Sequence, residues 1–211
     1  MDKYISFLIA YLLGSVPTAI WISKFFYKKD IRNYGSGNAG STNMYRVFGF
    51  KAGLATQIVD ILKGYIAAML PFRLWKEIPS EELTYIILGH GFFAILGHVF
   101  PLFASFKGGK GINTLLGVML AVMPEASLVG VLVFVVVLLL SKYVSLASMT
   151  AVFSLPVYLY LKSEITGEPL DIVLFVVGIL LFLGVIYTHR SNIRRILKGT
   201  ENKAGFLTKK K

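Results

Sequence analysis

Seven long apolar segments dominate the chain, separated by short stretches rich in Gly, Pro, Ser or charged residues. They cover residues 4–26, 51–72, 83–104, 111–124, 126–141, 144–161 and 169–187. A helix needs about 20 mostly apolar residues to cross the hydrocarbon core of a bilayer. The pattern therefore predicts an all-α integral membrane protein with seven transmembrane helices.

The fourth and fifth segments are short, and they meet at the sequence MPEA, residues 123–126. Pro124 followed by Glu125 inside apolar sequence is more typical of a turn between two helices than of a helix interior. We therefore expect two spans here. The alternative is a single bent span, which would give six helices in total.

Charged residues in the connecting stretches predict the orientation. Lys and Arg concentrate in residues 24–51, 107–110, 142 and 190–211, whereas acidic residues concentrate in the intervening stretches. Cytoplasmic loops carry the excess of basic residues. We therefore expect an outside N-terminus and a cytoplasmic C-terminus. Residues 1–211 would form one polytopic domain that ends in a basic cytoplasmic tail, residues 199–211.

Composition narrows the function classes. The chain has 211 residues, of which 55% are hydrophobic, and a mean hydropathy of +0.69, which is too apolar for an ordinary soluble domain. Its net charge of +11 follows from the membrane topology and from anionic lipids, so no nucleic-acid partner is expected. The absence of Cys excludes disulfides and thiolate chemistry. Asp30 and Glu201 are the acids expected on the cytoplasmic side, so neither a metal nor another cofactor is expected.

The first polar segment, residues 35–46, reads GSGNAGSTNMYR and interrupts otherwise apolar sequence. Glycines such as Gly37 permit positive φ, so that successive N–H groups can converge on an anion. Arg46 could close such a phosphate site with two hydrogen bonds. Further donors are supplied by Ser36, Asn38, Ser41, Thr42 and Asn43. The alternative is a flexible polar linker.

The glycine segment, residues 100–114, reads FPLFASFKGGKGINT. Lys107 and Lys110 supply positive charge just before a predicted helix, whose N-terminus favours anions. Backbone approach is eased by Gly108, Gly109 and Gly111. A Walker A loop is excluded, because Gly111 stands where that motif needs Ser or Thr after the Lys. The alternative is a short turn with topogenic lysines.

The C-terminal polar segment, residues 187–202, reads YTHRSNIRRILKGTEN and follows the last predicted span. His189 and Asn192 lie close enough to the membrane surface to reach a substrate at the level of the headgroups. Arg194, Arg195 and Lys198 are expected to bind anionic lipid. Ser145, in the turn KYVSLAS, could face the same site. The alternative for His189 is a purely interfacial position.

Ionisable residues also occur inside the predicted spans, where they are suspected of a function. Asp60 and Lys63 lie one helical turn apart and can form an ion pair. They are either a structural pair that braces the first polar segment or direct participants in the reaction. His98 precedes the glycine segment and is the better candidate for the site, whereas His90 is expected to pack in the core.

Together these motifs resemble those of the bacterial acyl-phosphate:glycerol-3-phosphate acyltransferase family. GSGNAGSTNMYR, GHVFPLFASFKGGKGINT, KYVSLAS and HRSNIRR followed by GTE occur in that order and cover nearly the whole chain. The departures are small. The first motif of the family usually reads Pro-Gly-Ala-Thr-Asn where residues 39–43 read AGSTN, and the second usually has Val-Ala-Thr where residues 112–114 read INT.

The resemblance implies that the chain acylates the 1-hydroxyl of glycerol 3-phosphate with a fatty acyl phosphate, which is the first step of bacterial phospholipid synthesis. It implies seven spans and a cytoplasmic-side site, in a protein that works among membrane lipids and is expected to be a monomer. Ser36 and Arg46 would act in catalysis or phosphate binding, and residues 108–111 would bind glycerol 3-phosphate. His189 and Asn192 would be needed for activity, and Glu201 would be structural.

Two points of chemistry follow from this implied reaction. The His-x4-Asp dyad of thioester-using acyltransferases is missing, because Ile95, Phe103 and Arg194 stand five places after the three histidines. Either His189 or the phosphate of the donor must therefore accept the proton.

The rival interpretation is a membrane transporter for a phosphorylated anionic solute, although the chain shows no internal repeat. A scaffold is the third class considered.

Overall fold

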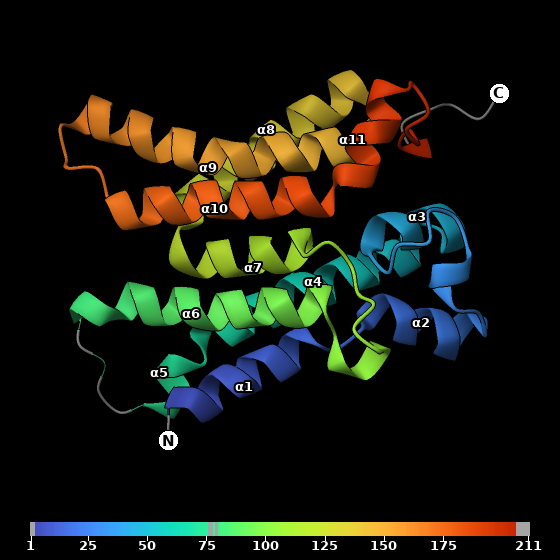
Figure 1. The fold of residues 1–211 in the computed structure, drawn as a ribbon, viewed down its shortest axis with the longest axis horizontal. Helices are drawn as coiled ribbons and strands as arrows, with labels where there is room; N and C mark the ends of the chain where they lie inside the picture. Colours follow the sequence, from blue (N-terminus) through green and yellow to red (C-terminus); the bar gives the residue numbers. More distant parts are fainter. Residues whose placement is uncertain (1–2, 76–77, 79, 206–211) are drawn as a thin grey trace. The chain divides into compact units, whose positions relative to one another are not determined.

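The structure, a computed structural model, describes residues 3–75, 78 and 80–205, so the last six residues of the expected tail lie outside it. Every regular element among the described residues is helical, as the sequence predicts. The chain divides into two compact units, Met1–Met123 and Pro124–Lys211. In Figure 1 the first unit runs from blue to green and the second from yellow to red.

The first unit is built around one central helix, α4. This helix contacts α1, α2, α3, α6 and α7, and α1 also packs along α6 (Figure 1). The helices are α1 (Lys3–Gly14), α2 (Thr18–Tyr27), α3 (Ser41–Phe48), α4 (Phe50–Met69), α5 (Pro71–Leu74), α6 (Ser80–Val99) and α7 (Ile112–Val122). Two 3-10 turns, η1 (Ile31–Asn33) and η2 (Leu102–Ala104), lie in the connections.

The second unit is a bundle in which α9 packs against both α8 and α10. Its helices are α8 (Pro124–Ser141), α9 (Val144–Thr166), α10 (Ile172–Thr188) and α11 (Arg190–Leu197). The short helix α11 is bent from α10 by 65°. Asp171 begins α10 by accepting a hydrogen bond from the backbone N–H of Leu174, at 2.9 Å.

Each of the seven apolar segments is helical, but the first is not one continuous helix. It breaks after Gly14 and resumes at Thr18, because Pro17 has no N–H to donate to the preceding turn. The break leaves the carbonyl of Val16 available, and that oxygen accepts hydrogen bonds from the Thr18 N–H and the Lys63 Nζ. A helix also ends at Val122 and the next begins at Pro124, where the sequence predicts a turn.

Within the described part of the chain, four segments are long and apolar enough to cross a membrane: Tyr4–Tyr27, Glu82–Ala104, Pro124–Ser141 and Val144–Thr166. The bent pair α10 and α11 makes a fifth if it is counted as one span. Of the remaining predicted spans, α4 carries Asp60 and Lys63, and α7 has only 11 residues, or about 16 Å of helix. The seven-span topology therefore stays a prediction.

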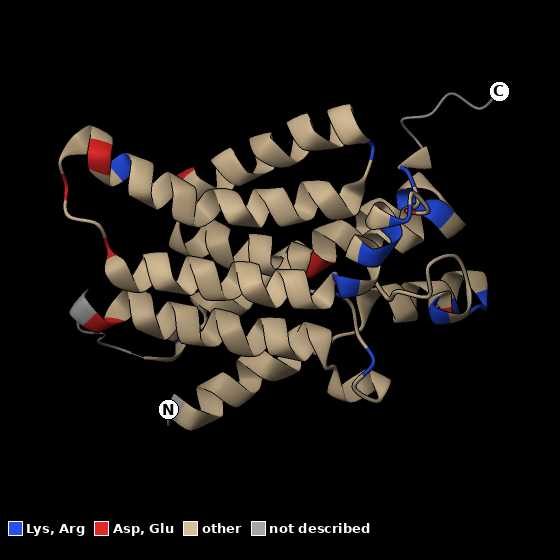
Figure 2. Ribbon diagram, turned by 45° about the horizontal axis from the view of Figure 1, so that its top comes forward, with Lys and Arg blue, Asp and Glu red and all other residues tan. Residues whose placement is uncertain are grey.

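Basic and acidic residues gather at opposite ends of each unit, as Figure 2 shows for each unit taken by itself. In the first unit the blue residues surround the end of α2, α3 and the connection before α7. In the second unit they surround α11, whereas red residues mark the connection between α9 and α10. Each bundle thus has a basic end and an acidic end.

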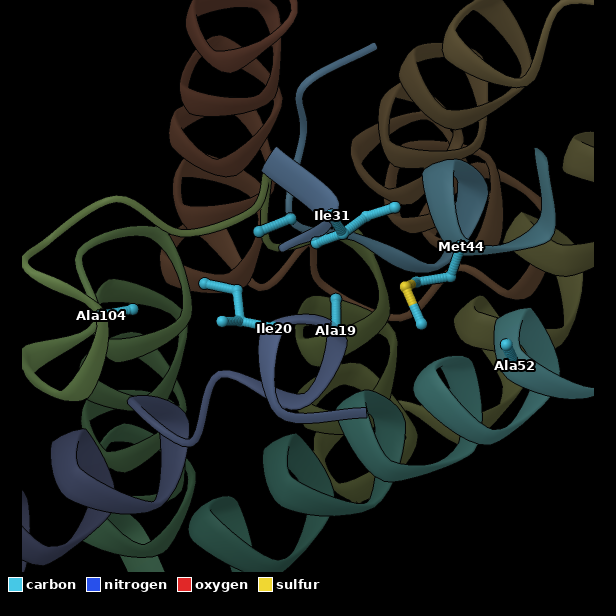
Figure 3. Packing of buried hydrophobic residues seen from close by; sticks show 7 residues of the cluster. Ala19, Ile20, Ile31, Met44, Ala52 and Ala104 are labelled. Carbon is cyan, nitrogen blue, oxygen red and sulfur yellow. The ribbon is translucent and has the colours of Figure 1, made fainter. Parts of the chain in front are cut away.

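A small apolar cluster supports the first polar segment from below. Ala19 and Ile20 of α2, Ile31 of η1 and Met44 of α3 pack together with Ala39, Ala52 and Ala104, and all are buried (Figure 3). Because these residues come from five different elements, their burial fixes the polar segment onto α2 and α4.

Glycines let the helices of the first unit approach closely. A β-carbon built on Gly64 of α4 would overlap the Thr114 carbonyl of α7, and one on Gly117 of α7 would overlap the Ile61 carbonyl of α4. Gly14 and Gly97 have the same reciprocal relation between α1 and α6. Small residues at helix crossings are a common device of membrane proteins, because they allow tight backbone contact.

We predict that Gly117→Ala destabilises the protein, because its methyl group would push α7 away from α4. Overpacking of this kind costs about 1–3 kcal/mol. The measurement is the apparent melting temperature in detergent. Gly184→Ala in α10 is the matched control, since a β-carbon there meets no atom within 4 Å. Equal melting temperatures for the two variants would contradict the close crossing.

Candidate active site

The polar residues singled out by the sequence form two groups, one in each unit. The first unit holds the first polar segment, the glycine segment and the residues beneath them, Asp60, Lys63 and His98. The second unit holds Ser145, His189, Asn192 and Glu201.

Asn43 organises the first polar segment from inside. Its side chain is 1% exposed, and its Nδ2 donates to the carbonyl oxygens of Tyr34 at 2.9 Å, Asn38 at 3.1 Å and Ile31 at 3.3 Å. Its Oδ1 accepts the backbone N–H of Ser36 at 3.0 Å. The side-chain amide of Asn43 is therefore occupied within the loop, while the side chain of Ser36 is exposed.

A hydrogen bond from Arg32, which lies just before this segment and pairs with Asp30, reaches the glycine segment. Arg32 contacts the Asp30 carboxylate through two nitrogens, with Nη2 2.7 Å from Oδ2 and Nε 3.0 Å from Oδ1, and Nη1 donates to the Ala104 carbonyl at 3.4 Å. The hydrogen bond and charge of Arg32 hold the pKa of Asp30 well below its usual range. Sequence reasoning missed this link, although an Asp two residues before an Arg was a visible signal.

The glycine segment folds back tightly onto the end of α6. Ser105 and Phe106 both have positive φ, 54° and 57°, which is a strained backbone conformation for residues other than glycine. The backbone N–H groups of Gly108 and Gly109 donate to the carbonyls of Val99 and His98, each at 3.2 Å. Lys107 is exposed at the turn.

The β-carbon positions of Gly108 and Gly109 face protein atoms. On Gly108 a β-carbon would overlap the His98 carbonyl, and on Gly109 it would overlap His98 Nε2 and lie 3.0 Å from the Ala39 carbonyl. The glycines therefore let the segment lie against α6 and the first polar segment. Gly111 has φ +82° and forms the N-cap of α7.

The N-termini of α3 and α7 are tied together by one side-chain hydrogen bond. Asn113 Nδ2 in the first turn of α7 donates to Ser41 Oγ, the first residue of α3, at 2.8 Å. Both helices have glycine N-caps, Gly40 and Gly111, so neither has a side-chain cap. Thr42 lies in the first turn of α3, and Arg46, which is exposed, lies in its last turn.

Several backbone N–H groups at these two N-termini make no hydrogen bond to the residues that the structure describes. They belong to residues 38–42 before and in α3, and to residues 111–114 at the start of α7. Unpaired N–H groups and the positive end of the helix dipole favour a bound anion. Two adjacent helix N-termini, next to Lys107 and Lys110, are suited to a phosphate group.

Asp60 and Lys63 form a buried ion pair, with Lys63 Nζ 2.8 Å from Asp60 Oδ1. Thr18 Oγ1 donates to the same carboxylate oxygen at 2.9 Å, and Lys63 Nζ also reaches the Val16 carbonyl at 2.9 Å. The pair thus holds the break between α1 and α2 against α4. Thr18 is a partner that sequence reasoning missed, and its place directly after Pro17 was the signal.

His98 and His90 differ in their surroundings. His98 is 7% exposed, and its Nδ1 lies 3.7 Å from Asp60 Oδ1, behind the glycine segment. His90 is fully buried, contacts Ser6 Oγ at 3.0 Å and the Ile86 carbonyl at 2.8 Å, and packs against Phe7. The contacts of His90 are those of a core residue, as expected.

Glu201 gathers three polar residues in the second unit. Its Oε1 accepts hydrogen bonds from Asn192 Nδ2 at 2.6 Å and Ser145 Oγ at 2.8 Å, and its Oε2 accepts one from Arg195 Nε at 2.7 Å. Burial alone would raise the pKa of Glu201. The hydrogen bonds that the carboxylate accepts and the charge of Arg195 outweigh this effect and hold the pKa below its usual value.

This cluster changes the expectation for Arg195, which was placed among residues that bind lipid. Its Nε instead pairs with Glu201, while Arg194 and Lys198 are exposed. A backbone hydrogen bond also joins two parts of the chain here, since the Ala204 N–H donates to the Lys142 carbonyl at 2.8 Å. The start of the tail is therefore held against the turn that carries Ser145.

His189 lies at the bend between α10 and α11 and is 3% exposed. Its Nδ1 is 2.9 Å from the Val185 carbonyl. A carbonyl can only accept, so Nδ1 carries the proton, and the Nε2 of the neutral ring is an acceptor. His189 is thus held in the tautomer that suits a base.

The comparisons with known proteins agree with the motifs. The model of the family described as glycerol-3-phosphate acyltransferase matches residues 4–199. The chain is 47% identical over 199 residues to glycerol-3-phosphate acyltransferase 2 of Bacillus anthracis, covering 94% of this chain and 97% of the relative. It is 38% identical over 223 residues to the glycerol-3-phosphate acyltransferase of Chlorobium limicola, covering 94% of each chain.

Two crystal structures of PlsY (YgiH), an integral membrane glycerol 3-phosphate acyltransferase, share the fold. The glycerol 3-phosphate form has a TM-score of 0.83 and 37% identity, covering 97% of this chain and 96% of that chain. The lysophosphatidic acid form has a TM-score of 0.79 and 35% identity, covering 95% and 94%. This chain therefore belongs to the glycerol-3-phosphate acyltransferase family of integral membrane proteins.

Proposed function

We propose that the chain transfers a fatty acyl group from acyl phosphate to the 1-hydroxyl of glycerol 3-phosphate, giving lysophosphatidic acid and inorganic phosphate. The observation that carries the proposal is the pair of helix N-termini joined by Asn113 and Ser41, whose unpaired N–H groups are suited to phosphate. Membership of the family supplies the acceptor, and the two structural relatives carry glycerol 3-phosphate and lysophosphatidic acid forms in their names.

In the first unit, the residues would divide between contact and support. Ser36, Gly37, Asn38 and Thr42 would contact phosphate together with Arg46, whereas Asn43 would hold the loop in shape. Lys107 and Lys110 would neutralise the anionic substrates. Residues 108–111 would bind glycerol 3-phosphate. The backbone N–H groups of Gly108 and Gly109 already donate to carbonyls of α6, so the main donors to the ligand would be Gly111 and the first turn of α7.

In the second unit, His189 and Asn192 would be needed for activity, and Ser145 would bind substrate. The 1-hydroxyl oxygen attacks the acyl carbonyl carbon, and the bond from this carbon to the phosphate oxygen breaks. The hydroxyl proton passes either to His189 Nε2 or to the departing phosphate. Holding two anions together accounts for most of the catalysis, because orientation and charge stabilisation can supply large rate factors without a covalent intermediate.

The proposal includes the cellular setting. The protein would act as a monomer in the bacterial cytoplasmic membrane, with both units forming one catalytic domain and the site on the cytoplasmic face. The support is the charge distribution, since basic residues in each unit gather at the end that carries the polar segments (Figure 2). The partners would be the two substrates and membrane lipids, with no cofactor and no nucleic acid.

We predict that purified protein makes a lipid-extractable product from radiolabelled glycerol 3-phosphate and palmitoyl phosphate, and makes none from palmitoyl-CoA. An acyl phosphate carries its own good leaving group, whereas a thioester needs a stronger base than these residues supply. Detergent-solubilised protein separates the enzyme from the transporter, because transport needs a sealed vesicle. Comparable turnover with palmitoyl-CoA would contradict the choice of donor.

Direct transfer predicts that no acyl-enzyme accumulates when the protein meets palmitoyl phosphate without acceptor. Intact-protein mass spectrometry measures this, because a palmitoyl group adds a fixed mass. The control is the same incubation quenched after addition of glycerol 3-phosphate. A stable adduct on Ser36, Ser145 or any other residue would overturn the mechanism.

The link between the two helix N-termini predicts a non-additive pair of substitutions. Ser41→Ala and Asn113→Ala each remove the same hydrogen bond, whose net worth of about 1 kcal/mol corresponds to roughly a fivefold rise in KM for glycerol 3-phosphate. The double variant should be no worse than either single variant. Steady-state kinetics test this, and a double variant with multiplied effects would show that the two side chains act separately.

The topology predicts which side of the membrane three engineered cysteines face, in a chain that has no Cys of its own. Ser105→Cys and Lys203→Cys should react with a membrane-impermeant thiol reagent from the cytoplasmic side, and Glu164→Cys from the outside. All three positions are exposed. The six-span alternative instead places Ser105 and Glu164 on the same side, so their labelling from one side would rule out seven spans.

A further inference from the structure

A buried polar network lies directly behind the glycine segment and has no assigned role in the reaction. Asp60 Oδ1 is the common acceptor for Lys63 Nζ at 2.8 Å and Thr18 Oγ1 at 2.9 Å. Asp60 and Lys63 are 1% and 7% exposed. Such a pair is costly to bury unless its hydrogen bonds are made, so its presence in an apolar helix calls for a reason beyond stability.

His98 connects this network to the glycine segment. Its Nδ1 faces Asp60 Oδ1 across 3.7 Å and makes no hydrogen bond to a described residue. Its Nε2 occupies the place where a β-carbon of Gly109 would lie. The imidazole ring therefore stands between the carboxylate and the backbone of the glycine segment.

Two further observations fix the position of the segment relative to the ring. The Gly109 N–H donates to the His98 carbonyl at 3.2 Å, so both the backbone and the side chain of His98 meet this glycine. On its other side, the Gly109 β-carbon position lies 3.0 Å from the Ala39 carbonyl of the first polar segment. A displacement of the ring would thus be passed to both polar segments.

We propose that Asp60 and His98 are positioning residues, which set the height of the glycine segment under bound glycerol 3-phosphate. Asp60, held by Lys63 and Thr18, orients the ring, and the ring supports Gly109. The inference rests on the proposed function, since it assigns a task to residues that do not touch substrate. It also gives Gly109 a different reason to be glycine: the missing side chain admits His98 rather than the phosphate.

Gly109 could be glycine to make room for the His98 ring or to make room for the phosphate. The two explanations predict different energetic coupling between residues 98 and 109. If Gly109→Ala acts by striking the ring, a smaller residue at position 98 removes most of its effect. If the methyl group instead blocks the phosphate, the effect of Gly109→Ala is independent of position 98.

The test is a double-mutant cycle with His98→Ala, Gly109→Ala and the double variant, measured as KM for each substrate and kcat. Gly109→Ala alone should raise KM for glycerol 3-phosphate by about tenfold, and in the His98→Ala background by less than about threefold, a coupling typical of residues in contact. KM for palmitoyl phosphate should stay within about twofold. An equal rise in both backgrounds overturns the proposal.

The apparent melting temperature of the same four proteins tests the contact without any substrate. Gly109→Ala should lower it in the wild-type background and leave it nearly unchanged beside His98→Ala. If His98→Ala is not recovered folded, His98→Asn takes its place, because asparagine is also smaller than histidine and keeps an N–H for Asp60. A wild-type protein with no acyltransferase activity refutes the proposed function, whereas uncoupled melting temperatures refute the positioning role.

Discussion

A carboxylate inside an apolar helix bundle must be neutralised and hydrogen-bonded, and Asp60 meets this requirement with Lys63 and Thr18. The break at Pro17 serves this requirement, because the freed Val16 carbonyl takes a second hydrogen bond from Lys63. Asp60 and Lys63 both lie on α4, the helix that contacts α1, α2, α3, α6 and α7. Thr18 of α2 and His98 of α6 both lie beside Asp60, and the glycine segment follows directly after α6.

The second unit solves a related problem at its basic end. Glu201 is the acid among many cations, and its two oxygens accept from Ser145, Asn192 and Arg195. Asn192 is thereby fixed near the bend at which His189 is held in a single tautomer by the Val185 carbonyl. In both units a carboxylate therefore holds several polar side chains, but only Glu201 directly contacts residues proposed to meet substrate, Ser145 and Asn192.

The seven apolar segments foretold the helices well, because length and hydropathy decide them locally. The polar segments do follow the long apolar helices, but the first and the C-terminal segment contain short helices, α3 and α11, that the hydropathy pattern did not predict. The sequence could not show that the side-chain amide of Asn43 bonds to the surrounding loop or that Asn113 donates to Ser41. These contacts join residues that are 12 and 72 positions apart. Gly109 illustrates the same point. The run of glycines suggested that a phosphate could approach the backbone here, whereas the space beside Gly109 is occupied by His98 and Ala39. Propensity predicts the elements, and tertiary contacts decide the task of each residue.

In the proposed function, the paired N-termini of α3 and α7 bind the phosphate of the substrate through backbone amides. Hydrogen–deuterium exchange of the detergent-solubilised protein tests it directly, with and without glycerol 3-phosphate and with glycerol as the control ligand. We expect slower exchange of the amides of residues 38–42 and 111–114, which have no partner among the described residues, and no change with glycerol. Unchanged exchange at both N-termini under saturating glycerol 3-phosphate would contradict it.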